Sequence, residues 1–173
     1  MTLVLNATPL IYLARAGGLG ILKGLRTSLY IPRAVYEEVV IQGRKNAKPG
    51  ADLVDQYVTE RVITVRNVPD ARMISSLVPA EGMKSPLHRG EAEVIALARE
   101  LNCPAIIDEQ AGRNVARLHG IEVHGTVYLL ALAFKAGNLS RDEMLRLFKA
   151  MVAEGWRISL EDYNAIMEEL EKL

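Results

Sequence analysis

Residues 87–109 constrain the fold of this chain most strongly. They are predicted to form a helix that begins with acidic residues, a short turn, and a buried strand that ends in acidic residues. Apolar residues recur at helical spacing on the helix, at Val94, Leu97, Ala98 and Leu101. The unbroken apolar run at residues 105–107 is typical of a strand covered on both faces. Asp108 follows at the carboxyl end of this strand, where open α/β sheets bind their ligands. The segment therefore predicts a parallel sheet with a carboxylate at its ligand-binding edge.

Strands and helices alternate along the rest of the chain. We expect strands near residues 3–5, 28–31, 62–65, 105–107 and 121–123. We expect helices near residues 19–25, 52–60, 88–101, 112–118, 127–135 and 141–153, with others beginning at Pro9, Pro32 and Ser159. Residues 43–50 and 67–86 are expected to be loops, and a helical turn near Met73 is left open. This alternation predicts an α/β fold with a mainly parallel sheet and right-handed crossovers.

Local signals predict where three of these helices begin. Thr8 is expected to cap the helix whose first residue is Pro9, because proline is favoured at that position. Ser140 is expected to cap the helix at residues 141–153. Residues 159–162 have the outline of a capping box for a last helix.

The composition indicates one domain of ordinary size across the 173 residues, and it excludes several classes of protein. The 21 Lys and Arg residues balance the 21 Asp and Glu residues, so any nucleic-acid site must be a local basic patch. Cys103 is the only cysteine, which excludes an intramolecular disulfide and a cysteine metal cluster; we expect it to be a small buried hydrophobe. No apolar run reaches the length of a membrane span, and the first residues lack the charges of a signal peptide. We therefore expect a soluble cytoplasmic protein.

Polar side chains collect at one edge of the predicted sheet. Carboxyl ends of parallel strands meet at a common edge, so residues that directly follow the strands come together there. These residues are Asn6 and Thr8 after the first strand, Asp108 and Glu109 after the fourth, and Thr126 after the fifth. Glu38 and Glu91 lie on helices that border the same edge.

Taken together, these residues resemble a PIN domain, the metal-dependent ribonuclease fold of VapC-type toxins, and more narrowly the DUF3368 family. The matching segments stand in family order at residues 5–14, 31–39, 87–93, 107–109 with Arg113, 125–126 and 154–159. The resemblance implies a three-layer α/β/α fold with a five-stranded parallel sheet in the order 3-2-1-4-5. It also implies one PIN-like domain over residues 1–173, with a core at 1–139 and extra C-terminal helices at 140–173.

The resemblance also implies a site that binds Mg²⁺ or Mn²⁺. The catalytic and metal-binding positions of the family fall on Asn6, Glu38, Glu91 and Asp108. Supporting or substrate-binding positions are Thr8, Thr126, Glu109, Arg113 and Arg89. Asp108 and Glu91 are expected to be the main ligands, and Glu38 is expected to hold or help activate a water bound to the metal.

Ordinary structural roles also account for these residues one at a time. Glu91 and Glu93 could be solvated acids favoured by the helix dipole, and Asp108 could cap the next helix. Asn6 could be a turn residue that bonds its own backbone, and Glu109 is the weakest candidate for a functional role. Cations that could line the edge, or could be ordinary solvated charges, are Arg33, Arg44, Lys45, Lys48 and Arg117.

Two functions compete. The first is a metal-dependent endoribonuclease that hydrolyses RNA phosphodiester bonds. Such an enzyme could be the VapC-type toxin of a toxin–antitoxin pair, inhibited by a small antitoxin protein. The second is a non-catalytic PIN-like module that binds RNA or a protein, because the aspartate usual after the first strand is Asn6, which brings no charge to a cation. A receiver-like domain ranks last, since residues 123–126 lack the lysine it requires. Resemblance further implies a homodimer. The apolar helices at 127–135 and 144–152 are candidate dimer faces, and a role in the buried core explains their apolar residues equally well.

Overall fold

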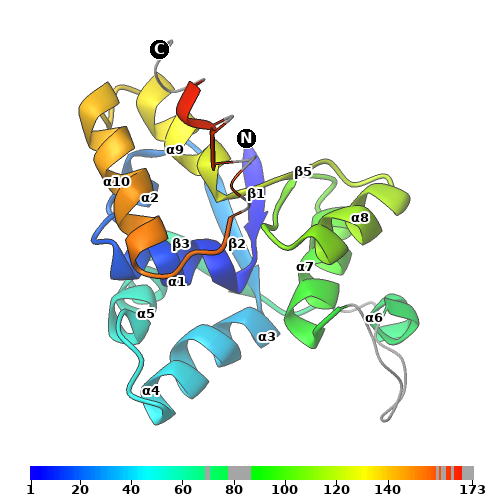
Figure 1. Ribbon diagram of the computed structural model, residues 1–173. Helices are drawn as coiled ribbons and strands as arrows, with labels where there is room; N and C mark the ends of the chain where they lie inside the picture. The colour runs from blue at the N-terminus through cyan, green and yellow to red at the C-terminus, as the bar shows by residue number, and fades with distance from the viewer. Residues whose placement is uncertain (69–70, 78–86, 159, 161–162, 165, 169–173) are drawn as a thin grey trace.

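A five-stranded parallel sheet forms the centre of the computed structural model, which describes residues 1–68, 71–77, 87–158, 160, 163–164 and 166–168 (Figure 1). The strands are β1 (Thr2–Leu5), β2 (Ser28–Pro32), β3 (Ile63–Arg66), β4 (Ala105–Ile106) and β5 (Val123–His124). Their order in the sheet is β3-β2-β1-β4-β5, and every neighbouring pair is parallel. The predicted fold class and strand order are confirmed.

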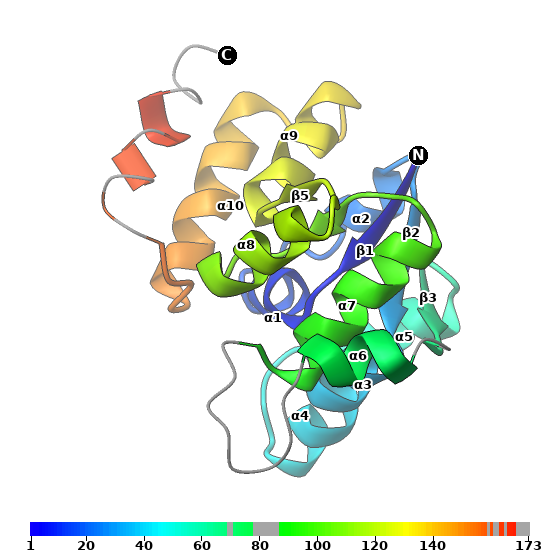
Figure 2. The same ribbon diagram turned by 90° about the vertical axis from the view of Figure 1, so that its right-hand side faces the viewer.

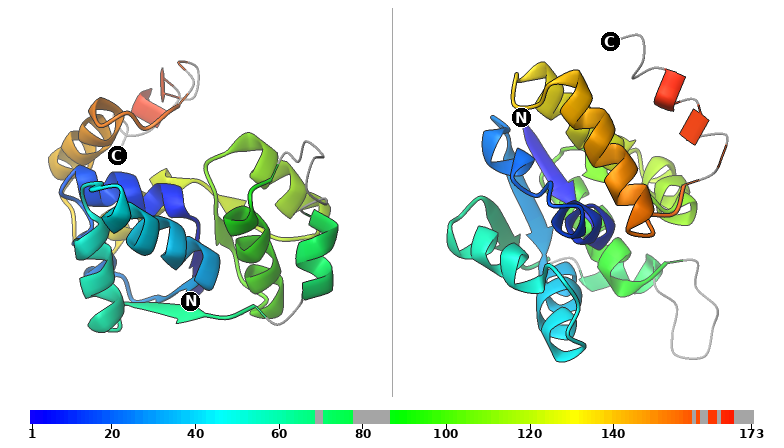
Figure 3. Two further views of the ribbon diagram at one scale, coloured as in Figure 1. Left: turned by 90° about the horizontal axis from the view of Figure 1, so that it is seen from below. Right: turned by 60° about the vertical axis from the view of Figure 1, so that its left-hand side comes forward.

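The central strands are buried because helices cover both faces of the sheet, as a parallel sheet requires. The helices are α1 (Ala7–Arg15), α2 (Ile21–Gly24), α3 (Arg33–Tyr36), the π-helical η1 (Glu37–Gln42), α4 (Gly43–Lys45), α5 (Ala51–Thr59), α6 (Ala71–Leu77), α7 (Arg89–Glu100), α8 (Gln110–Leu118), α9 (Thr126–Lys135) and α10 (Arg141–Ala153). Figure 1 shows α6, α7 and α8 on one side of the sheet and α1 and α10 on the other, and Figure 2 looks onto the side of α7 and α8. The view from below in Figure 3 separates the same two helical layers.

The switch point of the sheet lies between β1 and β4. Leu5 pairs with Ile106, and the backbone N–H of Asn6 donates to the Ile106 carbonyl at 3.0 Å. The chain leaves both strands at the same edge, and the next polar residues, Asn6 and Asp108, therefore emerge side by side. This register places the candidate site.

Several predicted boundaries differ from the observed ones. The prediction that Thr8 caps the first helix is wrong, because α1 begins at Ala7 with Asn6 as its N-cap, and Thr8 lies inside the first turn. Residues 43–45 continue a helix rather than forming a loop, because α3, η1 and α4 run on without a break. The helical turn left open near Met73 is α6. The capping box predicted at residues 159–162 falls largely outside the described residues.

The predicted cap at Ser140 is confirmed. The Ser140 hydroxyl accepts the N–H of Glu143 at the start of α10, while the Glu143 carboxylate accepts the N–H of Ser140. This reciprocal pair satisfies two backbone donors that a helix end would otherwise leave free. Among the described residues, no helix combines the length and apolar character needed to cross a membrane.

Candidate functional site

A cavity of about 600 Å³ opens at the carboxyl edge of the sheet, and we call it the acid cavity. It is lined by Thr8, Tyr12, His88, Glu91, Asp108, Glu109, Gln110, Ala111, Trp156 and Arg157. Three of the predicted acidic residues thus share one cavity, at the edge where parallel sheets bind ligands.

Hydrogen bonds fix the Asp108 carboxylate in the acid cavity. Oδ1 accepts the backbone N–H of Thr126 at 2.7 Å, and Oδ2 accepts the Thr126 hydroxyl at 2.5 Å and the indole N–H of Trp156 at 3.3 Å. Asp108 therefore caps α9, whereas Glu109 is the N-cap of α8, the next helix in the chain. Burial raises the pKa of Asp108, and the charge of Glu109 adds to this effect, while the bonds from Thr126 and Trp156 act in the opposite direction.

The Glu91 carboxylate is buried, so the prediction of a solvated acid is wrong for this residue. Its side chain is 5% exposed, and its Oε2 accepts the backbone N–H of His88 at 3.0 Å. Burial raises the pKa of Glu91 despite that bond, and the charges of Glu109 and Glu38 raise it further. Among the described residues, no Lys, Arg or His forms an ion pair with Glu91 or Asp108. The buried Glu91 carboxylate and the half-buried Asp108 carboxylate therefore lack a counter-ion within ion-pair distance among the described residues.

Glu93 lies two residues after Glu91 on the same helix, but its role differs from that of Glu91. Its Oε2 accepts the backbone N–H of Ala34 at 2.9 Å, at the start of α3, where the N-cap Pro32 has no side-chain acceptor. Its Oε1 forms an ion pair with Arg89 at 2.9 Å. The structure thus places Arg89 on Glu93, and Arg89 is not among the residues that line the acid cavity.

Glu109 links the ends of β1 and β4. The Thr8 hydroxyl donates to Glu109 Oε1 at 2.6 Å, and the Asn6 side-chain amide donates to Oε2 at 3.3 Å. Asn6 is buried, and its side chain makes no capping bond to its own helix. Glu109, the weakest candidate in the sequence, is therefore the residue that Asn6 and Thr8 both contact.

Three glycines, which we call the acid-facing glycines, each leave room for one predicted ligand. A Cβ atom added to Gly112 would lie 2.9 Å from Glu91 Oε1, and one added to Gly125 would lie 2.9 Å from Asp108 Oδ1. A Cβ atom on Gly90 would lie 3.2 Å from Glu38 Oε2. None of the three has a positive φ, so close approach of a carboxylate, and not backbone conformation, is what a side chain there would disturb.

Glu38 reaches this region from η1. Its side chain as a whole is exposed, but the carboxyl group lies against Gly90. Burial of that group raises the pKa of Glu38; the charge of Glu109 also raises it, while His88 and Lys48 act in the opposite direction. Glu38 therefore belongs to the same electrostatic group as Glu91 and Glu109.

The predicted cations are placed unequally. Arg33 pairs with Glu37, and Arg44 pairs with Asp52 and Asp55. Arg113 Nη1 would lie 3.7 Å from a Cβ atom on Gly125, near Asp108, and the buried Arg113 Nε has no hydrogen-bond partner. Arg157, which the sequence did not single out, lines the acid cavity.

The donor atoms fit Mg²⁺ or Mn²⁺ in type. Glu91, Asp108 and Glu38 offer carboxylate oxygens and Asn6 an amide oxygen, the ligands that hard cations prefer. The acid-facing glycines, and the Glu91 and Asp108 carboxylates without a counter-ion, also fit a cation. Within the described part of the chain, no three Asp, Glu, His or Cys side chains form a ready-made metal site. A bound cation would therefore have to draw the carboxylates together.

Sequence reasoning missed most of the uncharged lining. Tyr12 lies one helical turn after Thr8, so helical spacing could have indicated it. Trp156 and Arg157 lie in a matched segment of the family but had no role assigned. No spacing pattern connects them to this cavity, because they come to line it only through the packing of α10.

Comparisons with known proteins agree with the fold. The model of the DUF3368 family, described as a PIN domain, matches residues 2–172. A solved structure, a PilT N-terminus domain protein from the hyperthermophilic archaeon Sulfolobus solfataricus P2, is similar with a TM-score of 0.53 and 19% identity, over 77% of this chain and 93% of that chain. At this identity the likeness concerns the fold alone. No curated protein matches the chain in sequence.

Proposed function

The chain belongs to the DUF3368 family of PIN domains, and on that premise we propose that it is a metal-dependent endoribonuclease that hydrolyses RNA phosphodiester bonds. The observation that carries the proposal is the pair of carboxylates in the acid cavity, the buried Glu91 and the half-buried Asp108. Glu91 and Asp108 have raised pKa values and no cationic partner among the described residues, an arrangement that favours a divalent cation.

In this proposal Glu91 and Asp108 would hold Mg²⁺ or Mn²⁺, with Glu38 and the Asn6 amide oxygen beside them. When bound, the cation would lower the pKa of the attacking water and stabilise charge on the phosphate. The raised pKa of Glu38 makes its carboxylate a stronger base than an ordinary glutamate, which suits it to accept a proton from the attacking water.

The surrounding residues would orient these groups and the substrate. Thr126 and Trp156 hold Asp108, and the His88 backbone holds Glu91. Arg157 and Arg113 are placed to contact phosphates of the RNA backbone, which gives affinity without base selection.

The test is cleavage of a mixed RNA panel by the purified chain with Mn²⁺ or Mg²⁺, beside an EDTA control. Cleavage should require metal and should disappear in Asp108→Asn. Glu93→Gln is the matched control, because this acid lies on the same helix as Glu91 but bonds Ala34 and Arg89 instead of lining the cavity. Equal cleavage by wild type and Asp108→Asn would point to a contaminating nuclease and contradict the proposal, as would RNA binding without cleavage.

A second candidate is a non-catalytic module that binds RNA or protein, and Asn6 favours it. The Asn6 amide donates to Glu109 instead of adding a charge to the acid cavity. Asn6→Asp separates the two functions. Cleavage by wild type supports the nuclease, whereas cleavage that appears only in Asn6→Asp supports a natural protein that binds without cutting.

An antitoxin partner and a homodimer stay predictions of the family resemblance. The helices predicted as dimer faces bury Leu129, Leu130, Met144 and Phe148 within this chain, so a large part of their apolar surface is already covered. Light scattering at high micromolar concentration tests the dimer, and a monomer there would remove it.

A further inference from the structure

Trp156 contacts the site from a segment that follows the last long helix. Its side chain is 5% exposed, lines the acid cavity and donates its indole N–H to Asp108 Oδ2 at 3.3 Å. We propose that Trp156 is a positioning residue that orients the Asp108 carboxylate for cation binding. The turn at residues 154–156, which directly follows α10, is then part of the site. This inference rests on the proposed function.

The end of α10 fixes where the indole lies. Gly155 has a φ of +95°, and its N–H donates to the Val152 carbonyl at 3.0 Å. The N–H of Trp156 donates to the Met151 carbonyl at 3.0 Å. These two bonds around a left-handed glycine form a Schellman motif, which stops the helix and turns the chain in a defined direction. Trp156 is therefore delivered to Asp108 by backbone geometry.

Packing fixes the orientation of the ring. The Trp156 and Phe148 rings meet edge to face, with centroids 5.7 Å apart and an interplanar angle of 89°. Phe148 is fully buried on α10. Aromatic pairs prefer this arrangement, so the indole N–H has a fixed direction relative to the core.

The indole N–H of Trp156 occupies one of the hydrogen-bonding positions of the Asp108 carboxylate. An ionised carboxylate has about four lone-pair positions, two on each oxygen. Oδ2 accepts two hydrogen bonds, from Thr126 and Trp156, whereas Oδ1 accepts one, from the Thr126 backbone. Oδ2 is therefore satisfied, and the position left for a cation is on Oδ1. Hydrogen bonds of this kind to a ligand oxygen set its orientation and tune metal affinity.

Mn²⁺ binding separates positioning from packing. In Trp156→Phe the ring contact with Phe148 is largely kept but the N–H is lost, and we expect Mn²⁺ affinity to fall by about 10–100-fold, measured by electron paramagnetic resonance of the free ion. Phe148→Leu is the comparison variant, since it loosens the same packing but keeps the indole N–H donor. It should lower Tm and should reduce Mn²⁺ affinity by less than Trp156→Phe does. Wild-type affinity in Trp156→Phe, with an active wild type, would overturn the inference and leave the proposed function standing.

A second measurement uses the fact that Trp156 is the only tryptophan in the chain. In metal-free protein labelled with ¹⁵N-tryptophan, the single indole N–H resonance should move when Asp108→Asn replaces a charged acceptor by a neutral one. An unmoved resonance would overturn the contact whether or not metal binds. If the resonance moves in Asp108→Asn but the wild-type protein does not bind Mn²⁺, the contact is real. The proposed function and the positioning role would then both be overturned.

Discussion

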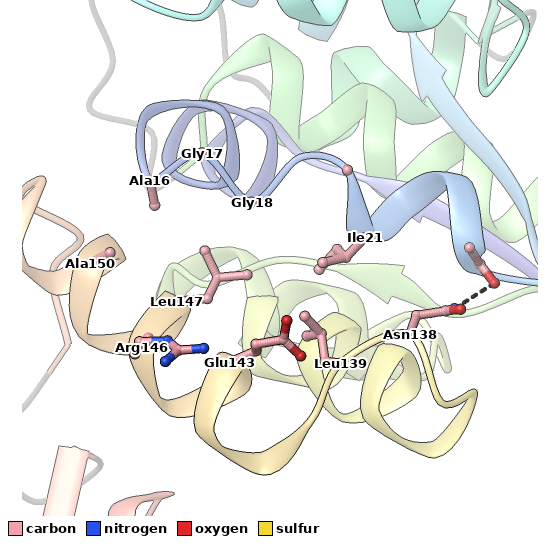
Figure 4. A pocket seen from close by; sticks show the side chains of 12 residues that line it. Ala16, Gly17, Gly18, Ile21, Asn138, Leu139, Glu143, Arg146, Leu147 and Ala150 are labelled. Carbon is pink, nitrogen blue, oxygen red and sulfur yellow. Dashed lines mark hydrogen bonds between the residues drawn. The ribbon is translucent and has the colours of Figure 1, made fainter.

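Two cavities have a volume of about 600 Å³ each, and their carboxylates differ in environment. The acid cavity is lined by Thr8 and Tyr12 of α1, and the other by residues 16–18, which directly follow α1. The second, which we call the seam cavity, lies between the α1–α2 connection and α10 (Figure 4). Two of its polar side chains are already hydrogen-bonded: Asn138 donates to the Gly24 carbonyl at 2.7 Å, and Glu143 accepts from Ser140. Bonds from Ser140 lower the pKa of Glu143, whereas the pKa values of Glu91 and Asp108 in the acid cavity are raised. Volume does not distinguish the two cavities, but the direction in which the pKa values of their carboxylates are shifted does.

Glycines line or border both cavities, and the side chains that these glycines face differ between the two cavities. A Cβ atom on Gly18 would collide with the Leu147 side chain, so this glycine allows close packing of α10 against the α1–α2 connection. A Cβ atom on Gly112 would crowd the Glu91 carboxylate and the Ile107 side chain. The glycine at the seam cavity thus allows apolar side chains to pack closely, whereas the glycine at the acid cavity leaves space for a carboxylate.

The largest expected contrast comes from removing one carboxylate in each cavity. Glu91→Gln keeps shape but removes a buried charge without a counter-ion, so RNA cleavage should fall by more than the roughly 100-fold typical of residues that only orient a ligand, with Tm unchanged or raised. Glu143→Ala should do the reverse, lowering Tm because the start of α10 loses its cap, with unchanged cleavage per folded molecule. Melting curves and cleavage rates on the same samples give both readings. Loss of activity in Glu143→Ala alone would transfer the function to the seam cavity.

Glycine substitutions give the second contrast. Gly112→Ala suits a helix, but the new methyl group crowds Glu91, and we expect Mn²⁺ affinity and cleavage to fall by about 10–100-fold. Gly18→Ala forces Leu147 aside, an overpacking that costs about 1–3 kcal/mol in the free energy of unfolding. Its cleavage rate should stay at the wild-type value. Calorimetric Mn²⁺ titration and urea unfolding of both variants test the pair, and wild-type Mn²⁺ affinity in Gly112→Ala would show that the glycine does not position Glu91.

The acid cavity also shows how far the sequence reaches. Asn6, Asp108 and Thr126 could be located because apolar runs mark where strands end, and parallel topology brings those ends together. Local pattern did not separate Glu91 from Glu93, since both are acids near one helix start, and only the family resemblance pointed to Glu91. Their difference arises because Pro32 leaves an N–H of α3 to be satisfied by Glu93, a long-range contact that no local pattern encodes.

The same limit applies to the lining. Thr8 was predicted to cap its own helix and instead bonds Glu109, because β4 delivers that acid next to β1. Trp156 lies 48 residues from Asp108 and reaches it only through the docking of α10 and the turn at Gly155. Helix and strand boundaries follow local chemistry, but the neighbours of a side chain depend on how the layers pack.

The pH dependence of stability should differ between the cavities. Acids with raised folded pKa values bind protons more readily in the folded than in the unfolded chain, so the metal-free protein should gain stability as pH falls from 7 toward the ordinary carboxyl values. Below these values the protein should lose the contributions of carboxyls whose pKa is lowered, Glu143 among them. We therefore expect the Tm in EDTA to be highest at mildly acidic pH. The double variant Glu91→Gln, Asp108→Asn should flatten the rise, and an unchanged rise would contradict the assignment to the acid cavity.

The smallest expected contrast concerns two exposed arginines, one on each cavity. Arg157 lines the acid cavity and Arg146 the seam cavity. If Arg157 contacts a phosphate, Arg157→Gln should raise the KM for RNA several-fold, leave kcat nearly unchanged, and reduce the slope of log affinity against log salt by about 0.7. Arg146→Gln should leave KM, kcat and the salt slope at their wild-type values. Equal changes in both variants would mean that the two charges act only through the overall field of the protein, and the acid cavity would then have no phosphate contact at Arg157.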